Sequence, residues 1–542
     1  MKSDSLPLKN GFPFHFAGVT LQTVAMTLAG GLPQVAWTQS GVGQGISIAP
    51  RVSVSETYTN NVLLSSTDKQ GELVTQVSPG IRIVSTGGRI TGSLDYSLNE
   101  LMYARNTSAR RSENALNAVG KIEAIDKWAY IDFSGVIGQQ SISAFGAPSS
   151  GGILLNGNST ETSIFTLSPH ISGRLGGAAD YEARYSLTSS QSKSDLVSSS
   201  DSKDLSVSLN GVGNRFGTGW TLAAAHHVID YSRGRSTQTQ LVSGQVSYLL
   251  NPQFGVYVKA NHESSDLATP ANQQDNYIAL GANWSPNPDA RLSVNKDTRG
   301  ATGYTASWIP SARTSVSATR ERRLYGDTHS IVLAYRTPNT AWTFNDSRSA
   351  VTTPGQASGA GSVSLYDLLY GQFAAGESDP VKRGQYDVFL QANGIKPNAT
   401  AVGGFLASSV SLQRQQQLSF ALFGVRSTVT VILTRGQNSS LDPLSTVVDD
   451  FSTSSVVRQN GLSVNYSYRW TAKSVLSFAA TRQNTTGSAT QAGTSSRSVN
   501  VNLSTQLSKD TSANVGARHV VFSSSTAPYT ETAVLGNLSL QF

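Results

Sequence analysis

Apolar and polar residues alternate along most of the chain from Ile46 onward. Residues 462–470 read LSVNYSYRW, and shorter examples are LDYSL at 94–98 and YEARYSL at 181–187. Successive side chains of a β-strand point to opposite sides, so strict alternation indicates a strand with one apolar and one polar face. The pattern therefore predicts a protein made of many strands that lie between apolar surroundings and water.

Two classes of connection separate these strands. Tight turns follow an aromatic residue or Leu, as after Leu250, Trp308 and Tyr335, and these turns contain Pro. The other connections are longer and polar, and they span residues 59–71, 106–113, 144–157, 191–204, 264–274, 438–451 and 484–496. Short turns that alternate with long loops are typical of outer-membrane β-barrels. We expect an all-β transmembrane antiparallel barrel of about 24 strands, within a range of about 20 to 26 because the strands between Arg291 and Tyr335 are short and charged.

Composition favours such a barrel over other classes. Of the 542 residues, 38% are hydrophobic and 14% are charged, which is less charge than a soluble enzyme usually carries. No run of about 18 apolar residues is present, which argues against membrane helices but not against a barrel. The absence of cysteine excludes disulfide frameworks and cysteine metal sites. The net charge of +7 is spread over the chain and requires only a solvated surface, so no nucleic-acid partner is expected.

Residues 1–40 have the features of a secretory signal peptide. Lys2 and Lys9 precede an apolar segment at 14–32, and small residues follow it. Ala36 and Ser40 are both candidate cleavage points, so the signal ends between residues 36 and 40. We divide the remaining chain into an N-terminal part of the barrel at 41–355, an insert at 356–398 and a C-terminal part of the barrel at 399–542.

The insert at 356–398 interrupts the alternation. Asp379 can cap a helix, Pro380 suits the first helical position and Gly394 can end the helix. We predict two short helices separated near Gly376, which plug the lumen, cap one end of the barrel or dock a partner. The turn count places the insert outside the cell or folded inward, and one miscounted strand would move it to the periplasm.

The chain ends on a strand with an aromatic last residue. Its apolar positions are Val534, Gly536, Leu538, Leu540 and Phe542. This ending resembles the C-terminal targeting strand of bacterial outer-membrane barrels, which the barrel-assembly machinery recognises. The resemblance implies an outer-membrane location and that machinery as a partner during biogenesis, together with surrounding lipid and lipopolysaccharide.

The same alternation assigns faces to charged and aromatic residues. The charges expected in the lumen are Arg82, Asp95, Asp132, Arg174, Glu182, Arg184, Lys259, Arg291, Arg469 and Arg518. They can line a path for an anionic or polyhydroxyl substrate, although the interior of a wide barrel is polar in any case. The aromatics expected at the membrane interface are Trp284, Trp308, Tyr335 and Trp470.

No constellation of residues indicates catalysis, a metal or a cofactor. His226 and His227 are adjacent and so point to opposite faces of the sheet, while no spacing singles out a nucleophile for His170. The loop acids Asp442, Asp449 and Asp450 lack the density of a calcium loop. We therefore expect a protein that is not an enzyme. A basic cluster at 320–323 can contact lipopolysaccharide phosphates, although a solvated loop explains it equally.

Four segments resemble one known family. They are ETYTNNV at 56–62, LVTQVSPGIRI at 73–83, LDYSL at 94–98 and DPVKRGQYDVFLQANG at 379–394. They are similar to the PEP-CTERM system-associated outer-membrane β-barrel family of bacteria that make exopolysaccharide and sort proteins by exosortase. The resemblance implies a conduit or secretion component, with exopolysaccharide as cargo and a periplasmic export partner. The alternatives are a passive diffusion porin, a structural or adhesion barrel that anchors a surface assembly, and an outer-membrane enzyme.

Overall fold

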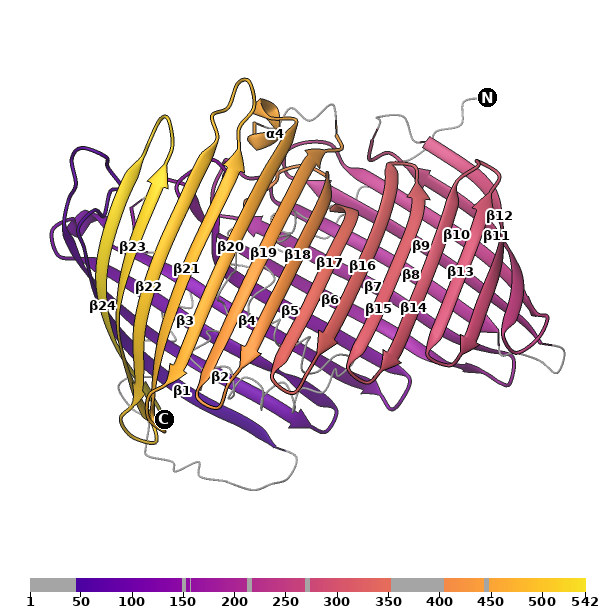
Figure 1. The fold of residues 1–542 in the computed structure, drawn as a ribbon, viewed down its shortest axis with the longest axis horizontal. Helices are drawn as coiled ribbons and strands as arrows, with labels where there is room; N and C mark the ends of the chain where they lie inside the picture. The colour runs from indigo at the N-terminus through magenta and orange to yellow at the C-terminus, as the bar shows by residue number, and fades with distance from the viewer. Residues whose placement is uncertain are drawn as a thin grey trace, which may run out of the picture. The chain divides into compact units, whose positions relative to one another are not determined.

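The computed structural model describes residues 45–148, 153–155, 157–211, 217–268, 273–351, 404–442 and 448–542. It contains one sheet of 24 strands in which strands adjacent in the chain pair antiparallel. β1 (Ile46–Thr59) also pairs with β24 (Tyr529–Gln541), and this pairing closes the sheet into a barrel (Figure 1). The predicted all-β barrel and its strand number are confirmed. The predicted signal peptide at 1–40 and the predicted insert at 356–398 lie outside the described residues.

The strands follow one another around the barrel in chain order. Between β1 and β24 they are β2 (Glu72–Gly87), β3 (Ile90–Tyr103), β4 (Arg111–Ile125), β5 (Ala129–Ser141), β6 (Ser159–Leu175), β7 (Ala179–Ser192), β8 (Ser200–Gly211), β9 (Thr218–Tyr231), β10 (Thr237–Leu249), β11 (Phe254–Ser265), β12 (Gln273–Asn287), β13 (Ala290–Asp297), β14 (Thr302–Ser311), β15 (Thr314–Arg323), β16 (Gly326–Arg336), β17 (Thr340–Val351), β18 (Ser411–Phe423), β19 (Ser427–Ser440), β20 (Val456–Arg469), β21 (Ser474–Thr486), β22 (Thr494–Gln506) and β23 (Thr511–Ser523). Two short helices, η1 (Thr107–Ala109) and α4 (Asp450–Thr453), lie in connections. Among the described residues, no helix is long and apolar enough to span a membrane.

The connections differ between the two ends of the barrel. At the end where Phe542 lies, turns such as 88–89 and 176–178 join the strands, whereas the other end carries 60–71, 142–158, 352–410 and 441–455. The connection that contains the predicted insert therefore leaves and re-enters the barrel at the long-loop end. The predicted asymmetry is weak between β13 and β16, because the connections 298–301 and 324–325 at that end have only four and two residues.

The tight turns at Trp284 and Trp308 lie further along the chain than the sequence suggested. β14 continues past Trp308 to Ser311, with an irregular register around Pro310, and β12 behaves in the same way around Pro286. Proline cannot donate a hydrogen bond to a ladder, so it is tolerated where the pairing is irregular. These prolines therefore lie in the last residues of their strands and not in the turns.

Alternate residues face opposite sides of the barrel wall. Leu433 on β19 pairs with Leu462 on β20, and Leu433 is 45% exposed. Thr430 pairs with Asn465 on the opposite side, and Thr430 is 1% exposed. In this part of the wall the apolar side chains are exposed and the polar ones are covered. That is the inverse of a soluble protein and the arrangement of a wall that faces lipid.

The seam between β1 and β24 is closed by a fully buried carboxylate. Glu531 accepts hydrogen bonds from Thr59 Oγ1 at 2.9 Å and from Arg518 Nη2 at 2.9 Å. Beside them, the Thr532 amide donates to Asn60 Oδ1 at 2.8 Å. Thr59 is the last residue of β1, Asn60 follows it, and Glu531 and Thr532 belong to β24. These bonds therefore join the first strand of the sheet to the last.

Candidate functional site: the barrel lumen

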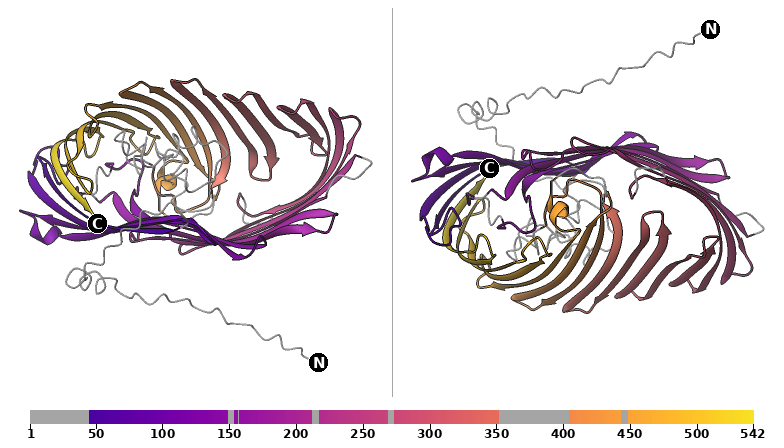
Figure 2. Two further views of the ribbon diagram at one scale, coloured as in Figure 1. Left: turned by 90° about the horizontal axis from the view of Figure 1, so that it is seen from below. Right: turned by 90° about the horizontal axis from the view of Figure 1, so that it is seen from above.

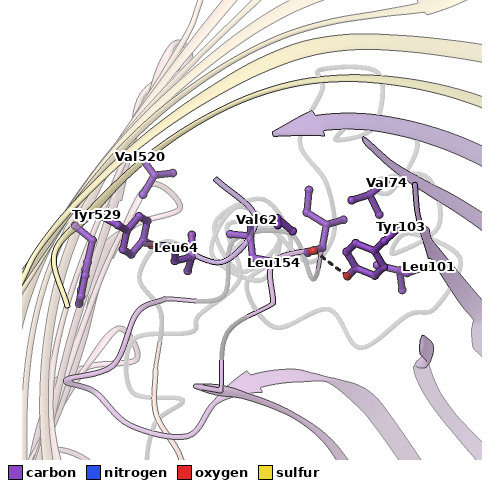
Figure 3. Close-up of a cluster of buried hydrophobic side chains, with 10 residues drawn as sticks. Val62, Leu64, Val74, Leu101, Tyr103, Leu154, Val520 and Tyr529 are labelled. Carbon is purple, nitrogen blue, oxygen red and sulfur yellow. Dashed lines mark hydrogen bonds between the residues drawn. The ribbon is translucent and has the colours of Figure 1, made fainter. Parts of the chain in front are cut away.

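Loops from the long-loop end fold into the lumen and pack there. Val62 and Leu64 from the connection 60–71 meet Leu154 from the connection 142–158, and inward-facing residues of β2, β3, β23 and β24 surround them (Figure 3). Tyr103 holds this cluster by donating its hydroxyl to the Ile153 carbonyl at 2.9 Å. The inside of the mouth beside the β1–β24 seam is therefore filled by apolar side chains.

A second layer joins three connections that are far apart in the chain. Asp450 of α4 accepts hydrogen bonds from Ser143 Oγ at 2.6 Å and from the Ala144 amide at 2.7 Å. Asp449 caps α4 by accepting from the Phe451 amide at 3.0 Å, and burial raises the pKa of both carboxyls. Both views of Figure 2 place α4 within the ring of strands. We call this contact between residues 143–144 and 449–451 the loop anchor.

Apolar side chains back the loop anchor. The rings of Phe405 and Phe451 lie 6.1 Å apart, edge to face, and Phe405 is 1% exposed. Phe145 and Val457 complete the cluster, and the Leu406 amide donates to the Ser141 carbonyl at 3.0 Å. The described end of the connection 352–410 is therefore held inside the barrel. Since Val457 belongs to this cluster, the odd-numbered residues of β20 face the lumen and the even-numbered residues face outward.

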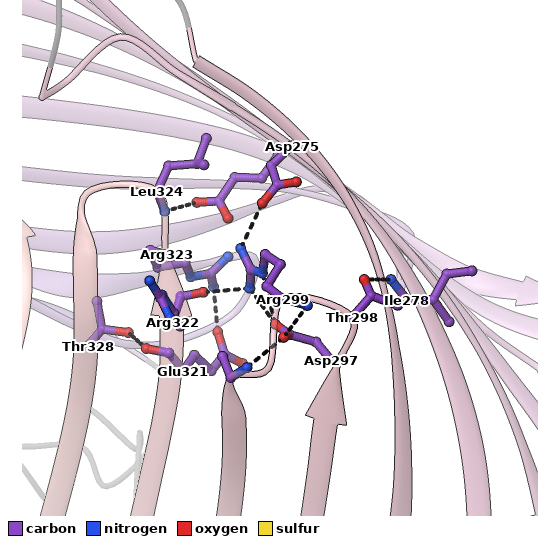
Figure 4. A network of polar contacts seen from close by, with 12 residues as sticks. Asp275, Ile278, Asp297, Thr298, Arg299, Glu321, Arg322, Arg323, Leu324 and Thr328 are labelled. Carbon is purple, nitrogen blue, oxygen red and sulfur yellow. Dashed lines mark hydrogen bonds and ion pairs between the residues drawn. The ribbon is translucent and has the colours of Figure 1, made fainter.

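The opposite part of the rim is held by charge. Arg299 binds Asp297 at 2.7 Å and Asp275 at 3.3 Å (Figure 4). Its guanidinium lies 3.5 Å from the centre of the Tyr277 ring. The Leu324 amide in the short β15–β16 connection donates to Glu263 Oε1 of β11 at 3.2 Å. These bonds draw the short connections of β13–β16 against the inner wall.

A cleft of about 260 Å³ lies between this rim and the inner wall of β8–β11. Its lining includes Asp204, His227, Thr239, Glu263 and Tyr325, and we call it the lumenal cleft. His227 Nδ1 contacts Asp204, whereas His227 Nε2 and Glu263 Oε2 are buried without a hydrogen-bond partner among the described residues. Buried polar atoms without partners carry a cost, so these two atoms are poised to bind a hydroxyl or a water.

Unpartnered polar atoms recur elsewhere along the inner wall. Thr237 Oγ1 and Asn261 Oδ1 flank the lumenal cleft on β10 and β11. A second group lies on β17–β19, where Asn345 Oδ1, Gln413 Nε2, Gln415 Nε2 and Asn438 Oδ1 have no partner in the described part of the chain. Both donors and acceptors on the inner side of the wall are therefore without partners among the described residues.

Six of the predicted lumen charges lie in ion pairs with other residues of the chain. Asp132 binds Arg184 at 2.6 Å and lies 3.4 Å from His170, whose ring stacks on Tyr130. The remaining pairs are Asp95 with Arg51, Arg174 with Asp180, Glu182 with Arg184, and Arg518 with Glu531. Sequence reasoning missed the partners Arg51 and Glu531, although both sit at inward positions of alternating strands and that signal was available.

Of the other predicted lumen charges, one adjoins an ion pair and three lie apart from the pairs. Arg82 is opposite Asp95 in the β2–β3 register. Lys259, Arg291 and Arg469 lie on the lumen-facing positions of β11, β13 and β20, and none forms an ion pair with another described residue. The structure therefore does not gather these charges into one path.

The remaining predicted residues lie near the edges of the wall. Trp284, Trp308, Tyr335 and Trp470 are between 44% and 60% exposed, close to the tight turns. On β24 the apolar positions of the predicted targeting strand face outward, and the Phe542 amide donates to the Pro50 carbonyl at 2.9 Å. Their roles as interface anchors and targeting signal stay predictions.

The histidines and acids that the sequence raised as candidates are separated or bound to protein groups. His226 and His227 lie on opposite faces, and Asp442 lies 3.6 Å from Arg235. The basic cluster at 320–323 is divided by the wall, because Arg323 pairs with Glu321 on one face and Arg320 pairs with Asp327 on the other. Among the described residues, no three His, Asp or Glu side chains are placed to hold a metal ion.

Comparison with solved structures finds similar barrels at low identity. The FrpB iron transporter from Neisseria meningitidis, in its apoprotein form, has a TM-score of 0.44 and 10% identity, with 91% of this chain and 81% of that chain covered. The siderophore receptor PirA from Pseudomonas aeruginosa has a TM-score of 0.37 and 9% identity, covering 91% of this chain and 80% of that one. A mutant of the ferric enterobactin receptor PfeA from Pseudomonas aeruginosa has a TM-score of 0.37, 10% identity and coverage of 92% and 81%.

The closed barrel and its apolar outer wall decide the location. The protein is an outer-membrane β-barrel. No protein-family model and no curated protein matches the chain. Iron and siderophores are the cargo named for those similar barrels. TM-scores below 0.5 and identities near 10% do not indicate which substrate this protein has.

Proposed function

We propose that this outer-membrane barrel is a conduit for a neutral, hydroxyl-rich polymer, with bacterial exopolysaccharide as its cargo. The observation that carries the proposal is the inner wall. Around the lumenal cleft and on β17–β19, buried donors and acceptors without partners face the lumen. Sugar hydroxyls both donate and accept hydrogen bonds, so they match such a surface.

The charges of the lumen support a neutral cargo. Asp132 with Arg184, Arg518 with Glu531 and Arg299 with Asp297 neutralise each other. A path selective for anions would gather unpaired charge of one sign into a ring, as selective pores do. Lys259, Arg291 and Arg469 carry such charge, but they lie on β11, β13 and β20, which are not neighbours in the sheet. The choice of exopolysaccharide among neutral cargoes comes from the resemblance of residues 56–62, 73–83 and 94–98 to barrels associated with exopolysaccharide synthesis.

The loop anchor separates the proposal from a passive porin. A diffusion pore needs an open mouth, whereas here α4, Phe405 and the connections 60–71 and 142–158 occupy part of the lumen. A partly filled mouth is compatible with a conduit that passes a single polymer chain. The periplasmic export partner expected from the sequence belongs to the same proposal.

Current through the protein in planar bilayers, with and without dextran as a neutral glucan, tests the proposal. We expect dextran to cause resolved blockades in the wild type, because its hydroxyls pair with the wall. His227→Phe should shorten the blockades by roughly tenfold, since it removes hydrogen bonds in the lumenal cleft. Val228→Phe, one residue away and facing outward, should leave them unchanged. An ionic current that dextran does not interrupt would favour the diffusion porin instead.

A further inference from the structure

We infer that the outer wall of β17–β22 binds phosphate-bearing lipid of the outer leaflet through a row of arginines. The row consists of Arg348, Arg414, Arg435, Arg458, Arg482 and Arg497. The proposal does not depend on the cargo, since it concerns the opposite side of the wall from the lumenal cleft.

The register places these arginines on one continuous surface. Arg348 is paired with Arg414, and Arg482 is paired with Arg497. Leu462 is paired with Arg482, and Leu462 shares the outward, even-numbered face of β20 with Arg458. Arg414 is paired with Gln437, so Arg435 lies two residues nearer the tight turns than Arg414. Arg458 is paired with Thr486, so Arg482 lies four residues nearer the tight turns than Arg458.

The height of the row fits the boundary of the membrane. A tilted transmembrane strand needs about 9–11 residues to cross the bilayer. The intervals from Arg426 to Arg435, from Lys473 to Arg482 and from Arg497 to Leu507 all have this length. The distance from the tight turns to the arginine row is therefore about the thickness of the membrane, which places the row at the headgroups of the outer leaflet.

The residues below the row are those that contact acyl chains. On β19 and β20, Leu433 and Leu462 are exposed immediately on the tight-turn side of Arg435. Trp342 and Phe420 extend the same surface, with ring centres 4.3 Å apart. A ligand of this surface must be apolar on the side of the tight turns and anionic beside the arginines, as a phosphorylated lipid is.

The arginines are available to a ligand. Arg414 is bound to Asp346 at 2.9 Å, and apart from it no member of the row forms an ion pair within the part of the chain that the structure describes. Arg414 and Arg435 line a cleft of about 140 Å³ together with Gln416 and Gln437. Guanidinium groups bind phosphate through paired hydrogen bonds, and the glutamine amides add donors.

The opposite wall lacks this character. At a similar distance from the tight turns, the outward positions of β3, β8 and β9 carry Glu100, Asp201 and Asp230. The cations beside these acids are Arg110, 3.8 Å from Glu100, and Lys203, 3.9 Å from Asp230, and they do not form a row. The arginine row is therefore confined to one side of the barrel, and we expect bound lipid phosphate on that side alone.

Binding of diphosphorylated lipid A to the full-length folded protein in micelles tests the inference, with retained lipid counted by native mass spectrometry. The triple variant Arg435→Gln/Arg482→Gln/Arg497→Gln should bind about 100-fold more weakly than the wild type. Lys259→Gln/Arg291→Gln/Arg469→Gln removes the same charge from the lumen side and should bind as the wild type does. Replacing the same outer arginines by lysine should give an affinity between those of the wild type and the glutamine variant, because the charge remains while the paired hydrogen bonds are lost.

Three results would overturn the inference. Lipid A could bind equally to the wild type and the outer triple variant, or equally weakly to the outer and lumen variants. Inorganic phosphate could compete at the concentration of the lipid, which would indicate a plain anion site and no lipid site. If the triple variant does not fold, as judged by heat-modifiable migration, Arg482→Gln alone decides through a measurable loss of retained lipid, and an unchanged count would contradict the inference.

Discussion

Arginine placed at Val464 should destabilise the barrel far more than arginine placed at Asn465. Val464 faces outward between Val431 and Ala480, midway between Arg458 and Trp470 on its strand, and so lies near the middle of the bilayer. Arginine on the lipid face at that depth costs about 2–4 kcal/mol. This cost corresponds to a folding equilibrium weakened by about 30- to 700-fold.

The matched substitution at Asn465 should cost little. Asn465 lies between Thr430 and Ala479 on the lumen side, where a long cationic side chain reaches water. The assay is urea unfolding of each variant refolded in phospholipid vesicles, monitored by tryptophan fluorescence and by heat-modifiable migration. Equal midpoints for Val464→Arg and Asn465→Arg, or a lower midpoint for Asn465→Arg, would refute the assignment of faces.

Three further predictions concern the seam, the loops and assembly. Arg518→Ala should lower the free energy of unfolding by about 3–5 kcal/mol in the same urea assay, because it leaves Glu531 buried without its cation, and a cost below about 1 kcal/mol would contradict this. Burial raises the pKa of Asp449 and Asp450 when the loop anchor is docked, so docking takes up protons. Docking is therefore favoured at a pH below the pKa of the undocked carboxyls and loses that advantage as pH rises through the raised pKa. Single-channel conductance should therefore fall on acidification, and the Asp449→Asn/Asp450→Asn variant should lose that dependence. Deleting Phe542 should reduce the amount of protein in outer-membrane fractions and leave degraded or aggregated periplasmic protein, and normal migration of the truncated chain would contradict a targeting role.

The fold could be predicted from the sequence because a barrel wall is a local pattern. Each strand carries its own period of two, as in residues 462–470, and the strand count follows from adding such segments. The pattern was weakest where strands are short, and there the expected long loops gave way to the connections 298–301 and 324–325. Those connections are held by Arg299 and Glu263, whose partners lie on other strands and leave no local signal.

The interior of the mouth could not be predicted, since it depends on contacts between distant segments. Asp450 binds Ser143, and Phe405 packs on Phe451, across intervals that no periodicity spans. Charges show the same limit, because alternation places Asp95 in the lumen but does not identify Arg51 as its partner. The arginine row was within reach of the sequence, because Arg482 and Arg497 continue the apolar face of their strands.

The amount of surface polysaccharide on the encoding bacterium tests the conduit most directly. A strain lacking the gene should lose surface exopolysaccharide and regain it when the full-length protein is supplied. The His227→Phe variant should restore less surface exopolysaccharide than the Val228→Phe variant. Unchanged surface polysaccharide in the deletion strain, with normal ionic current through the purified protein, would contradict the conduit and leave a porin.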